Sequence, residues 1–565
     1  MKTKTRKPKD ESEKKISLKL TILAIVLIAI FSIAITPVTF QNDTYYTIKV
    51  GEHIAEYGID MQDPFSWHQD LAYTYPHWLY DLITYMIYSA FGFVGIYITT
   101  CILSVALGIS IFWVNRKLVK NEVISFFVTI GAMYLLMPYI AARAQLATFI
   151  LFAWTIFFIE KFLETKKKRY AIGLIIIPIL IANLHVAVFP FYFVLYLPYI
   201  GEYLIVLLGE FVYYKKFKIW LLKTRIKGLE KSNKNEEKLG KLKEELNQLE
   251  EKVDKVKIRR TKDIKNPYKI KIVKNDAVKW LILIMIICVF TGFLTPLGDT
   301  PYTYLSKTMQ GNTTENINEH QPMTLATDTE IICTLILFIA ILMFTKAKIR
   351  LCDLFMLAGL LYMMLASRRQ VSMFAIMCSV ILNRLILEID RIYTGNTIKD
   401  AAKVMAGKVG MILTTVLVLL LSFYFAKDKF DDTLVDETQY PVQACDFILE
   451  NIDLGTARFY NEYNYGSYMI FRGIPVFIDS RADLYSPEFS GKQDDIFMDF
   501  INVSGISTFY EDVFEKYDIT HVITYKSSKM NMIIKKTNDP NYKQIYEDNY
   551  FTIYERETST NKIEE

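Results

Sequence analysis

The sequence has little cysteine, and its cysteines form neither a disulfide framework nor a metal-binding pattern. Five of the six lie in apolar stretches, no two have C-x-x-C spacing, and only Cys445 lies in the polar C-terminal part. H-E-x-x-H and D-x-D spacings are also missing, as are G-x-G-x-x-G, G-K-S/T and G-x-S-x-G in the C-terminal part. The C-terminal part must therefore be held together by its own core, and these metal, nucleotide and nucleophile motifs do not define its chemistry.

Long apolar runs are the main feature that the sequence does have, in a chain that is 52% hydrophobic and 14% aromatic. A helix of about 20 such residues crosses a bilayer. Inside lipid every backbone polar group must find an intramolecular partner, so such runs are helices and not isolated strands. The clearest runs are Leu20–Val38, Trp280–Leu294, Glu330–Phe344 and Gly410–Ala426. The sequence therefore predicts a polytopic integral membrane protein with an all-α membrane domain.

Positive charge is concentrated in a few loops, and its distribution predicts how the chain threads the membrane. The stretch Lys215–Lys279 has 22 Lys and Arg against 10 Asp and Glu, a net charge of +12, whereas the whole chain carries +5. Basic loops stay on the cytoplasmic side. Placing this stretch and the smaller basic clusters there predicts about eleven spanning helices, a cytoplasmic N-terminus and an extracytoplasmic C-terminal part. The same rule accounts for the basic stretch without any nucleic-acid partner.

Two details of this threading concern the N-terminal half. The first apolar run is too long for a typical signal peptide and no A-x-A cleavage site follows it, so we expect an uncleaved anchor. Residues His77–Phe91 contain Asp81 and five aromatic side chains, and we expect them to form a helix at the outer membrane interface. Two spans between Trp78 and Val114, with one miscounted elsewhere, form the alternative.

The predicted organisation has five parts. They are a basic cytoplasmic tail (1–19), an N-terminal membrane module (20–213) with its first outer loop at 39–76, a basic cytoplasmic insert (214–278), further membrane helices (279–426) and an extracytoplasmic α/β domain (427–565). About 130 residues are enough for that domain to have its own core. In it we expect the strands Arg458–Tyr463, Pro475–Asp479, His521–Tyr525 and Tyr550–Tyr554 and the helices Asp494–Ser504 and Glu511–Tyr517.

The basic insert contains an apolar repeat typical of a coiled coil. The repeat consists of Leu239, Leu242, Leu246, Leu249, Val253 and Val256. Their alternating spacing of three and four is an a/d seam of about three heptads. A helical hairpin, with the chain near 225–234 turning back, or a dimer contact would bury this seam. We expect an accessory role, and recruitment of a cytoplasmic partner or of anionic lipid through 225–262 is the alternative.

Polar residues interrupt the apolar runs at the predicted outer helix ends. They are Arg143, Gln145, Asn183, His185, Glu319, His320, Gln321, Arg368, Arg369 and Gln370. In the predicted threading they converge on the first outer loop, Thr39–Pro76. Ionisable groups at membrane depth are costly and usually functional, so we predict one extracytoplasmic site there; ordinary interfacial residues are the alternative.

The first outer loop is rich in carboxylates and aromatic rings. Asp43 follows the first span by only a few residues, so partial desolvation is expected to raise its pKa and to suit it to proton abstraction. Asp60 is better explained as a turn former before Pro64. Secondary candidates in this loop and in the C-terminal domain are His53, Asp63, Asp479 and Arg481. Loop carboxylates could hold a divalent metal ion, although no ligand spacing requires one.

Several strings, taken in order, resemble the outer loops of bacterial GT-C type membrane glycosyltransferases. The first loop reads Asp43-Thr-Tyr-Tyr, Gly51-Glu-His-Ile and Asp63-Pro-Phe-Ser-Trp and is followed by His77-Trp-Leu-Tyr, where the family often has D-x-W-W-H, D-P-F-S and E-W-L. Further matches are Arg143-Ala-Gln145, Asn183-Leu-His185, Leu294-Thr-Pro296, Glu319-His-Gln-Pro322, Arg368-Arg-Gln370, Tyr460-Asn-Glu-Tyr-Asn-Tyr-Gly-Ser-Tyr and Phe477-Ile-Asp-Ser-Arg-Ala-Asp-Leu-Tyr. Tyrosines in place of two tryptophans, Ala144 in place of Pro and His77 in place of Glu are departures that leave the donor type open.

The resemblance implies transfer of a sugar on the outer side of the membrane. The donor would be a polyprenyl-phosphate or polyprenyl-diphosphate sugar, the acceptor a hydroxyl of a glycan, protein or lipid, and Asp43 the general base. The residues expected to bind the donor phosphate and the substrate are Arg143, Gln145, His185, Glu319, His320, Arg368 and Arg369. The arginines would neutralise the phosphate, because guanidinium groups match phosphate oxygens, and the histidines would donate hydrogen bonds to the leaving phosphate.

A second hypothesis is a non-catalytic component, polymerase or flippase of cell-envelope polysaccharide assembly. A polymerase would lengthen a lipid-linked glycan, whereas a transferase would add one residue per event. A flippase would not depend on Asp43. In each case we expect the chain in the cell membrane, with membrane lipids around it.

Overall fold

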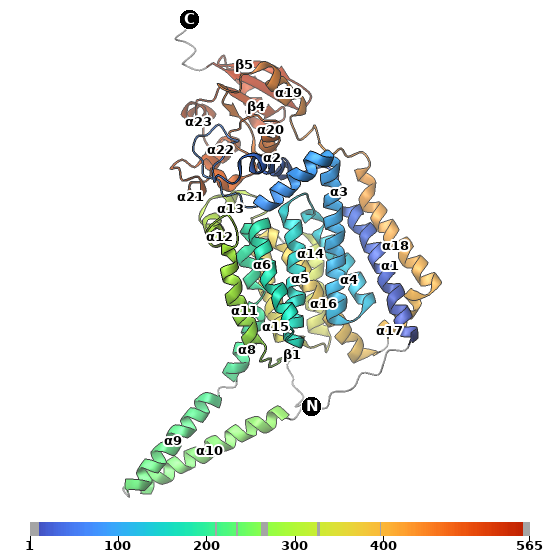
Figure 1. The fold of residues 1–565 in the computed structure, drawn as a ribbon, viewed down its shortest axis with the longest axis vertical. Coiled ribbons are helices and arrows are strands. Elements are labelled where there is room, and N and C mark those ends of the chain that lie inside the picture. The colour runs from blue at the N-terminus through green and yellow to red at the C-terminus, as the bar shows by residue number, and fades with distance from the viewer. Residues whose placement is uncertain are drawn as a thin grey trace.

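The computed structural model describes residues 11–209, 212–232, 236–261, 269–324, 328–395 and 397–557. A helical bundle makes up most of it, and a smaller α/β domain covers one end of the bundle (Figure 1). The bundle helices and the short helices that connect them are α1 (Glu11–Ile35), α3 (Trp78–Val119), α4 (Glu122–Leu136), α5 (Ala144–Thr165), α6 (Lys168–Leu184), α7 (Phe189–Val194), α8 (Leu197–Gly209), α11 (Val278–Phe290), α14 (Thr329–Phe344), α15 (Leu351–Ala366), α16 (Val371–Tyr393), α17 (Thr397–Ala406) and α18 (Lys408–Ala426).

The helices confirm a multi-pass membrane protein. In the described part of the chain, seven helices are long and apolar enough to cross a membrane. The predicted total of about eleven additionally requires α6, α11, α14 and α15, which have 13 to 17 residues each. Helices of that length can span when the polar breaks at their ends lie near the membrane surface. The total of eleven stays a prediction.

The segment predicted as the first outer loop contains a helix, α2 (Asn42–Tyr57), which the sequence did not predict. Its buried residues include Thr44, Tyr45, Ile48 and Gly51, whose spacing of three and four places them on one helical face. A Cβ added at Gly51 would lie 2.1 Å from the Asp81 carbonyl oxygen, so α2 and α3 pack backbone against backbone. This contact with α3 fixes the height and direction of α2.

Helix α3 is broken at Gly92, between its 78–91 part and its long apolar part. Gly92 has φ 61° and ψ −158°, a backbone conformation that glycine adopts and L side chains rarely do. Figure 1 shows the first part of α3 beside α2 at the upper end of the bundle, before the helix turns down into it. The break separates the aromatic segment predicted to lie at the interface from the segment that crosses the bundle.

The C-terminal domain is built on a four-stranded mixed sheet of order β3-β4-β6-β5, in which only β3 and β4 are parallel. Its strands are β3 (Phe459–Tyr460), β4 (His521–Tyr525), β5 (Tyr542–Glu547) and β6 (Phe551–Arg556). Its helices are α19 (Val442–Asn451), α20 (Tyr463–Phe471), α21 (Pro487–Ser490), α22 (Ile496–Gly505), α23 (Tyr510–Lys516) and α24 (Lys529–Thr537). Five of these ten elements, β3, β4, β6, α22 and α23, lie where the sequence predicted an element of the same type.

The predicted strand Pro475–Asp479 is wrong, because this segment makes no ladder. The Asn461 side chain takes the hydrogen bonds that a neighbouring strand would supply: its Oδ1 accepts from Phe477 N at 2.9 Å and its Nδ2 donates to Ile478 O at 2.7 Å. An isolated bridge joins Val476 to Ser66 of the first outer segment. The segment therefore connects the C-terminal domain to the chain between α1 and α3.

The basic insert forms a pair of helices, α9 (Val212–Ser232) and α10 (Glu236–Thr261). Lys223 Nζ lies 2.8 Å from Glu250 Oε1 and Lys243 Nζ lies 2.7 Å from Glu230 Oε1, so the two helices pair as a hairpin. The side chains of Val253 and Val256 in the predicted seam lie outside the described residues, as does the tail before residue 11. Figure 1 shows the hairpin and the N-terminal end of α1 at the end of the bundle opposite the C-terminal domain.

After the hairpin, the chain is joined to the bundle by a short pair of parallel strands, β1 (Ile270–Lys271) and β2 (Ile349–Arg350). At the other end of the bundle, α12 (Thr300–Gln310) and α13 (Thr313–Asn316) connect α11 to α14. These two short helices lie between the bundle and the C-terminal domain and contribute one wall of the cavity described next.

Candidate functional site

A cavity of about 930 Å³ lies where the C-terminal domain covers the bundle. Its lining includes most of the predicted site residues: Asp43, Arg143, Gln145, His185, Glu319, His320, Arg369 and, from the secondary candidates, Arg481. Apart from Arg481, which belongs to the C-terminal domain, these side chains come from the breaks between α1 and α3, α4 and α5, α6 and α7, α13 and α14, and α15 and α16. The polar breaks therefore meet in one place.

Arg143 joins two carboxylates at this cavity. It is the N-cap residue of α5, and its Nη2 lies 2.8 Å from Oδ2 of Asp43 in the first turn of α2. Its Nη1 lies 3.2 Å from Oε1 of Glu319. Burial by itself would lower the pKa of Arg143, but Asp43 and Glu319 raise it. Burial would raise the pKa of Glu319, and Arg143 brings it below its ordinary value. The guanidinium thus holds both carboxylates in place and favours the anionic form of Glu319.

Arg369 comes from another polar break, the one between α15 and α16, and its environment differs from that of Arg143. It belongs to the short turn η4 (Arg368–Gln370), and its backbone N–H donates to Glu319 O at 3.0 Å. Its Nη2 lies 3.4 Å from His185 Nε2. Within the described residues no carboxylate forms an ion pair with Arg369. The guanidinium is therefore a half-buried cation that faces the cavity.

Arg368, the neighbouring residue in the same turn, is not brought to the cavity. Its Nη2 donates to Thr324 Oγ1 at 2.7 Å and lies 3.9 Å from Asp328 Oδ2. Its carbonyl accepts from Tyr139 OH at 2.7 Å, and Gln145 in turn donates to Tyr139 O at 3.1 Å. Of the two adjacent arginines that the sequence could not separate, Arg369 is the one at the cavity.

Three histidines line the cavity as neutral groups. The rings of His77 and His185 lie 4.9 Å apart, and His185 is 2% exposed. Burial, followed by the charges of Arg369 and Arg143, lowers the pKa of His77 to about 3. Burial and the neighbouring His77 hold the pKa of His185 well below its ordinary value, and burial and Arg369 lower that of His320. Neutral imidazoles offer one N–H donor each without adding charge.

His77 was not among the predicted site residues, although the sequence contained a signal for it. It stands directly before α3 at the position where the resembling family often has Glu. Asp483 was also missed: its carboxylate accepts from Tyr304 OH at 2.8 Å and from Thr313 Oγ1 at 2.9 Å. These bonds join the α12–α13 connection to the C-terminal domain, a long-range contact that no local pattern indicates.

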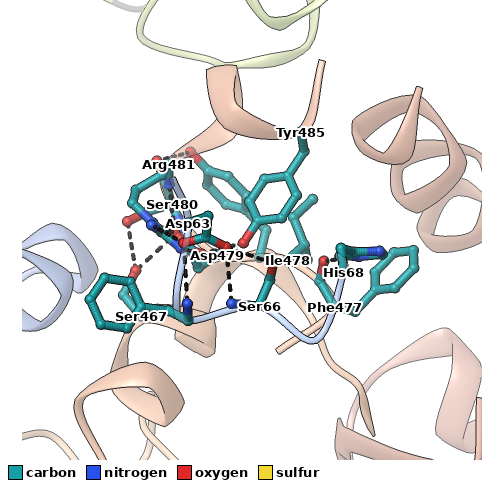
Figure 2. A network of polar contacts seen from close by, with 12 residues as sticks. Asp63, Ser66, His68, Ser467, Phe477, Ile478, Asp479, Ser480, Arg481 and Tyr485 are labelled. Carbon is teal, nitrogen blue, oxygen red and sulfur yellow. Dashed lines mark hydrogen bonds and ion pairs between the residues drawn. The ribbon is translucent and has the colours of Figure 1, made fainter. Parts of the chain in front are cut away.

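Three of the four secondary candidates, Asp63, Asp479 and Arg481, form a buried ion network that connects the first outer loop to the C-terminal domain. Figure 2 shows Arg481 between Asp63 and Asp479, with Tyr485 turned toward the Asp479 carboxylate. Arg481 Nη1 lies 2.7 Å from Asp63 Oδ1 and Nη2 lies 2.8 Å from Asp479 Oδ2, with side chains 3% exposed or less. Burial would raise the pKa of Asp63, but Arg481 and Ser66 lower it. With this geometry the network can hold the first outer loop against the C-terminal domain.

His53 is not part of the cavity lining. Its Nε2 lies 3.1 Å from Asp60 Oδ2, and its ring stacks on Tyr75 at 6.3 Å. Asp60 Oδ1 accepts from the backbone N–H of Gln62 at 3.1 Å, so Asp60 is the turn former that the sequence suggested. Within the described residues, no three His, Cys, Asp or Glu side chains group closely enough to hold a metal ion.

Comparison with known proteins shows the fold. No protein-family model and no curated protein sequence matches the chain. Among solved structures, the chain is similar to the oligosaccharyltransferase of Archaeoglobus fulgidus in its apo form, with a TM-score of 0.52 and 10% identity over 91% of this chain and 70% of that one. The chain therefore shares the overall fold of that structure.

Proposed function

We propose that this protein is a membrane glycosyltransferase that moves a sugar from a polyprenyl-phosphate-linked donor to an acceptor hydroxyl. The main support is that Asp43 and Arg369, from separate breaks in the chain, line one large cavity beside the membrane helices, where Arg143 lies 2.8 Å from Asp43. A base and a phosphate-binding cation in one cavity are the groups that such a transfer needs. The GT-C-like fold agrees with this chemistry but does not select the substrates.

In the proposed reaction the Asp43 carboxylate takes the proton of the acceptor hydroxyl. The acceptor oxygen then attacks the anomeric carbon, the bond from that carbon to the phosphate oxygen breaks, and its electron pair leaves with the polyprenyl phosphate. Arg143 keeps Asp43 oriented, and Arg369 is placed to bind the phosphate. His185 and His320 act as neutral hydrogen-bond donors to the departing phosphate oxygens.

The deciding experiment is transfer by the full chain in lipid nanodiscs supplied with a labelled lipid-linked sugar and candidate acceptors. We expect Asp43→Asn to lower the transfer rate by about 100-fold or more, because the amide cannot accept the proton. Asp70→Asn is the matched control: it lies in the same outer segment, and the Asp70 side chain is 87% exposed. Full transfer by Asp43→Asn would refute the proposed base.

Product size separates the proposal from its rivals. A transferase adds one sugar per event, so the product should shift by a single residue. A ladder of lengthening lipid-linked glycans would identify a polymerase instead. Lipid translocation without any transfer, and without dependence on Asp43, would identify a flippase.

A further inference from the structure

The charges that line the cavity leave one cation without a counter-ion. Three cationic side chains line it: Arg143, Arg369 and Arg481. Arg143 is shared by Asp43 and Glu319, and Arg481 is shared by Asp63 and Asp479. No lysine lines the cavity in the described part of the chain. Arg369 is therefore the cation available to an incoming anion.

The surroundings of Arg369 add neutral imidazoles, and the other cation that acts on Arg369, Arg143, is itself paired with Asp43 and Glu319. Arg369 Nη2 lies 3.4 Å from His185 Nε2, and the His77 ring lies 4.9 Å from the His185 ring at a tilt of 56°. Arg368, one residue away, faces Thr324 and Asp328 outside the cavity lining. A ligand at Arg369 thus meets one full positive charge and neutral imidazoles.

We infer that the phosphate subsite at Arg369 is built for a single negative charge, so that the donor is a polyprenyl-monophosphate sugar and not a polyprenyl-diphosphate sugar. This inference rests on the proposed function. A sugar-phosphate diester carries one negative charge, which one guanidinium neutralises in a bidentate pair. A diphosphate brings a second charge, and burying it beside Asp43 and Glu319 without a partner is strongly unfavourable.

The reaction balances with this donor. The acceptor loses its proton to Asp43, the new bond forms between the acceptor oxygen and the anomeric carbon, and the old bond to the phosphate oxygen breaks. The diester becomes a polyprenyl-phosphate monoester that carries one more negative charge. The neutral imidazole of His320, which lines the cavity, can donate an N–H to the oxygen on which that charge develops.

The test measures donor affinity of the full chain in nanodiscs for two lipids that share the sugar and the polyprenyl chain and differ by one phosphate. Each is measured with a chelator and with added Mg²⁺. We expect the monophosphate donor to bind at least tenfold more tightly in both conditions. Equal or tighter binding of the diphosphate donor, with or without Mg²⁺, would overturn the inference and leave the proposed function standing. Binding of neither lipid would overturn both.

Adjacent arginines provide the matched variants. Arg369→Gln should weaken binding of the monophosphate donor by about tenfold to a hundredfold, since it removes a charged hydrogen-bond pair. Arg368→Gln should leave the affinity within about twofold of the wild type. An equal loss in both variants would overturn the assignment of the subsite to Arg369. The comparison of the two lipids on the unmodified chain needs no variant, so a poorly folding variant does not weaken the test.

Discussion

At the scale of single residues, the cavity is organised by how each arginine is neutralised. Arg143 pairs with Asp43 and Glu319, Arg481 pairs with two buried aspartates, and Arg369 pairs with none in the described part of the chain. An arginine shared by two carboxylates positions them, whereas one without a carboxylate is free to bind an anion. The same residue type thus has three different tasks within one cavity.

The buried histidines make a prediction about pH. Folding lowers the pKa of His77 to about 3 and also lowers the pKa values of His185 and His320. An unfolded histidine has a pKa of about 6.5, so below this pH the unfolded chain binds more protons than the folded chain. The stabilising contribution is complete above that pH and is lost as pH falls toward 3. Each histidine contributes at most about 1.4 kcal/mol per pH unit.

Thermal unfolding in nanodiscs between pH 7.5 and pH 4.5 measures this effect. The unfolding midpoint of the wild type should fall with pH, and His77→Gln should have a shallower slope because one titrating group is gone. A variant slope equal to that of the wild type would contradict the assignment of His77 as a neutral buried group.

At the scale of elements, the direction of α3 depends on one glycine. Gly92 has φ 61°, and a side chain there should cost about 1–3 kcal/mol of stability. We expect Gly92→Ala to lower the thermal unfolding midpoint and to disturb the packing of α2 on α3. Gly131→Ala in α4 is the matched control, since a Cβ there meets no atom within 4 Å and should be neutral or slightly stabilising. Equal midpoints for the two variants would show that the break carries no strain.

The buried network of Asp63, Asp479 and Arg481 makes a second prediction at this scale. Asp63→Asn leaves Arg481 paired with Asp479 but removes its charged hydrogen bond to Asp63, and the loss of such a buried bond costs about 1.5–3 kcal/mol. Denaturant unfolding of the full chain measures the loss. Asp518→Asn is the control: its pair with Arg458 is on the surface of the same domain, with the Asp518 side chain 79% exposed, and should change stability by less than about 1 kcal/mol. A loss as small as that of the control would show that the network does not fasten the segments.

At the scale of the whole molecule, the two ends of the bundle differ in kind. The basic hairpin and the N-terminal end of α1 lie at one end, and the C-terminal domain with the cavity lies at the other (Figure 1). From the positive-inside rule we expect the cavity to lie on the outer face of the membrane. A donor lipid would reach it from the outer leaflet.

Labelling of single added cysteines in intact cells checks this sidedness. Asp518→Cys in the C-terminal domain should react with a membrane-impermeant maleimide. Lys241→Cys in α10 should react only after the membrane is permeabilised. Of the native cysteines, Cys333 is exposed on the helix α14, so its replacement by serine provides the background. The reverse pattern of labelling would place the cavity in the cytoplasm and refute an outer-face reaction.

Much of the architecture was predictable because it depends on local composition. Apolar runs of bilayer length, the basic insert and the strand His521–Tyr525 all follow from residues close together in the sequence. Helix α2 was not predicted, because its polar and aromatic composition is unlike that of a typical amphipathic helix. Packing on α3 stabilises it instead, through Gly51 and the backbone of Asp81. The segment 475–479, which was predicted as a strand, makes no ladder for a similar reason, because a contact outside the segment decides its structure. The Asn461 side chain takes the hydrogen bonds that a neighbouring strand would make.

The sequence by itself determined that the chain is a membrane protein and the order of its polar breaks, because hydrophobicity and charge act segment by segment. Only the tertiary structure decided that Arg369 and not Arg368 faces the cavity, that Arg143 joins Asp43 to Glu319, and that Arg481 fastens two distant segments. Those choices depend on side-chain directions and on contacts between residues far apart in the chain. Neither is encoded in spacing or composition, because both arise only when the helices and the C-terminal domain pack together.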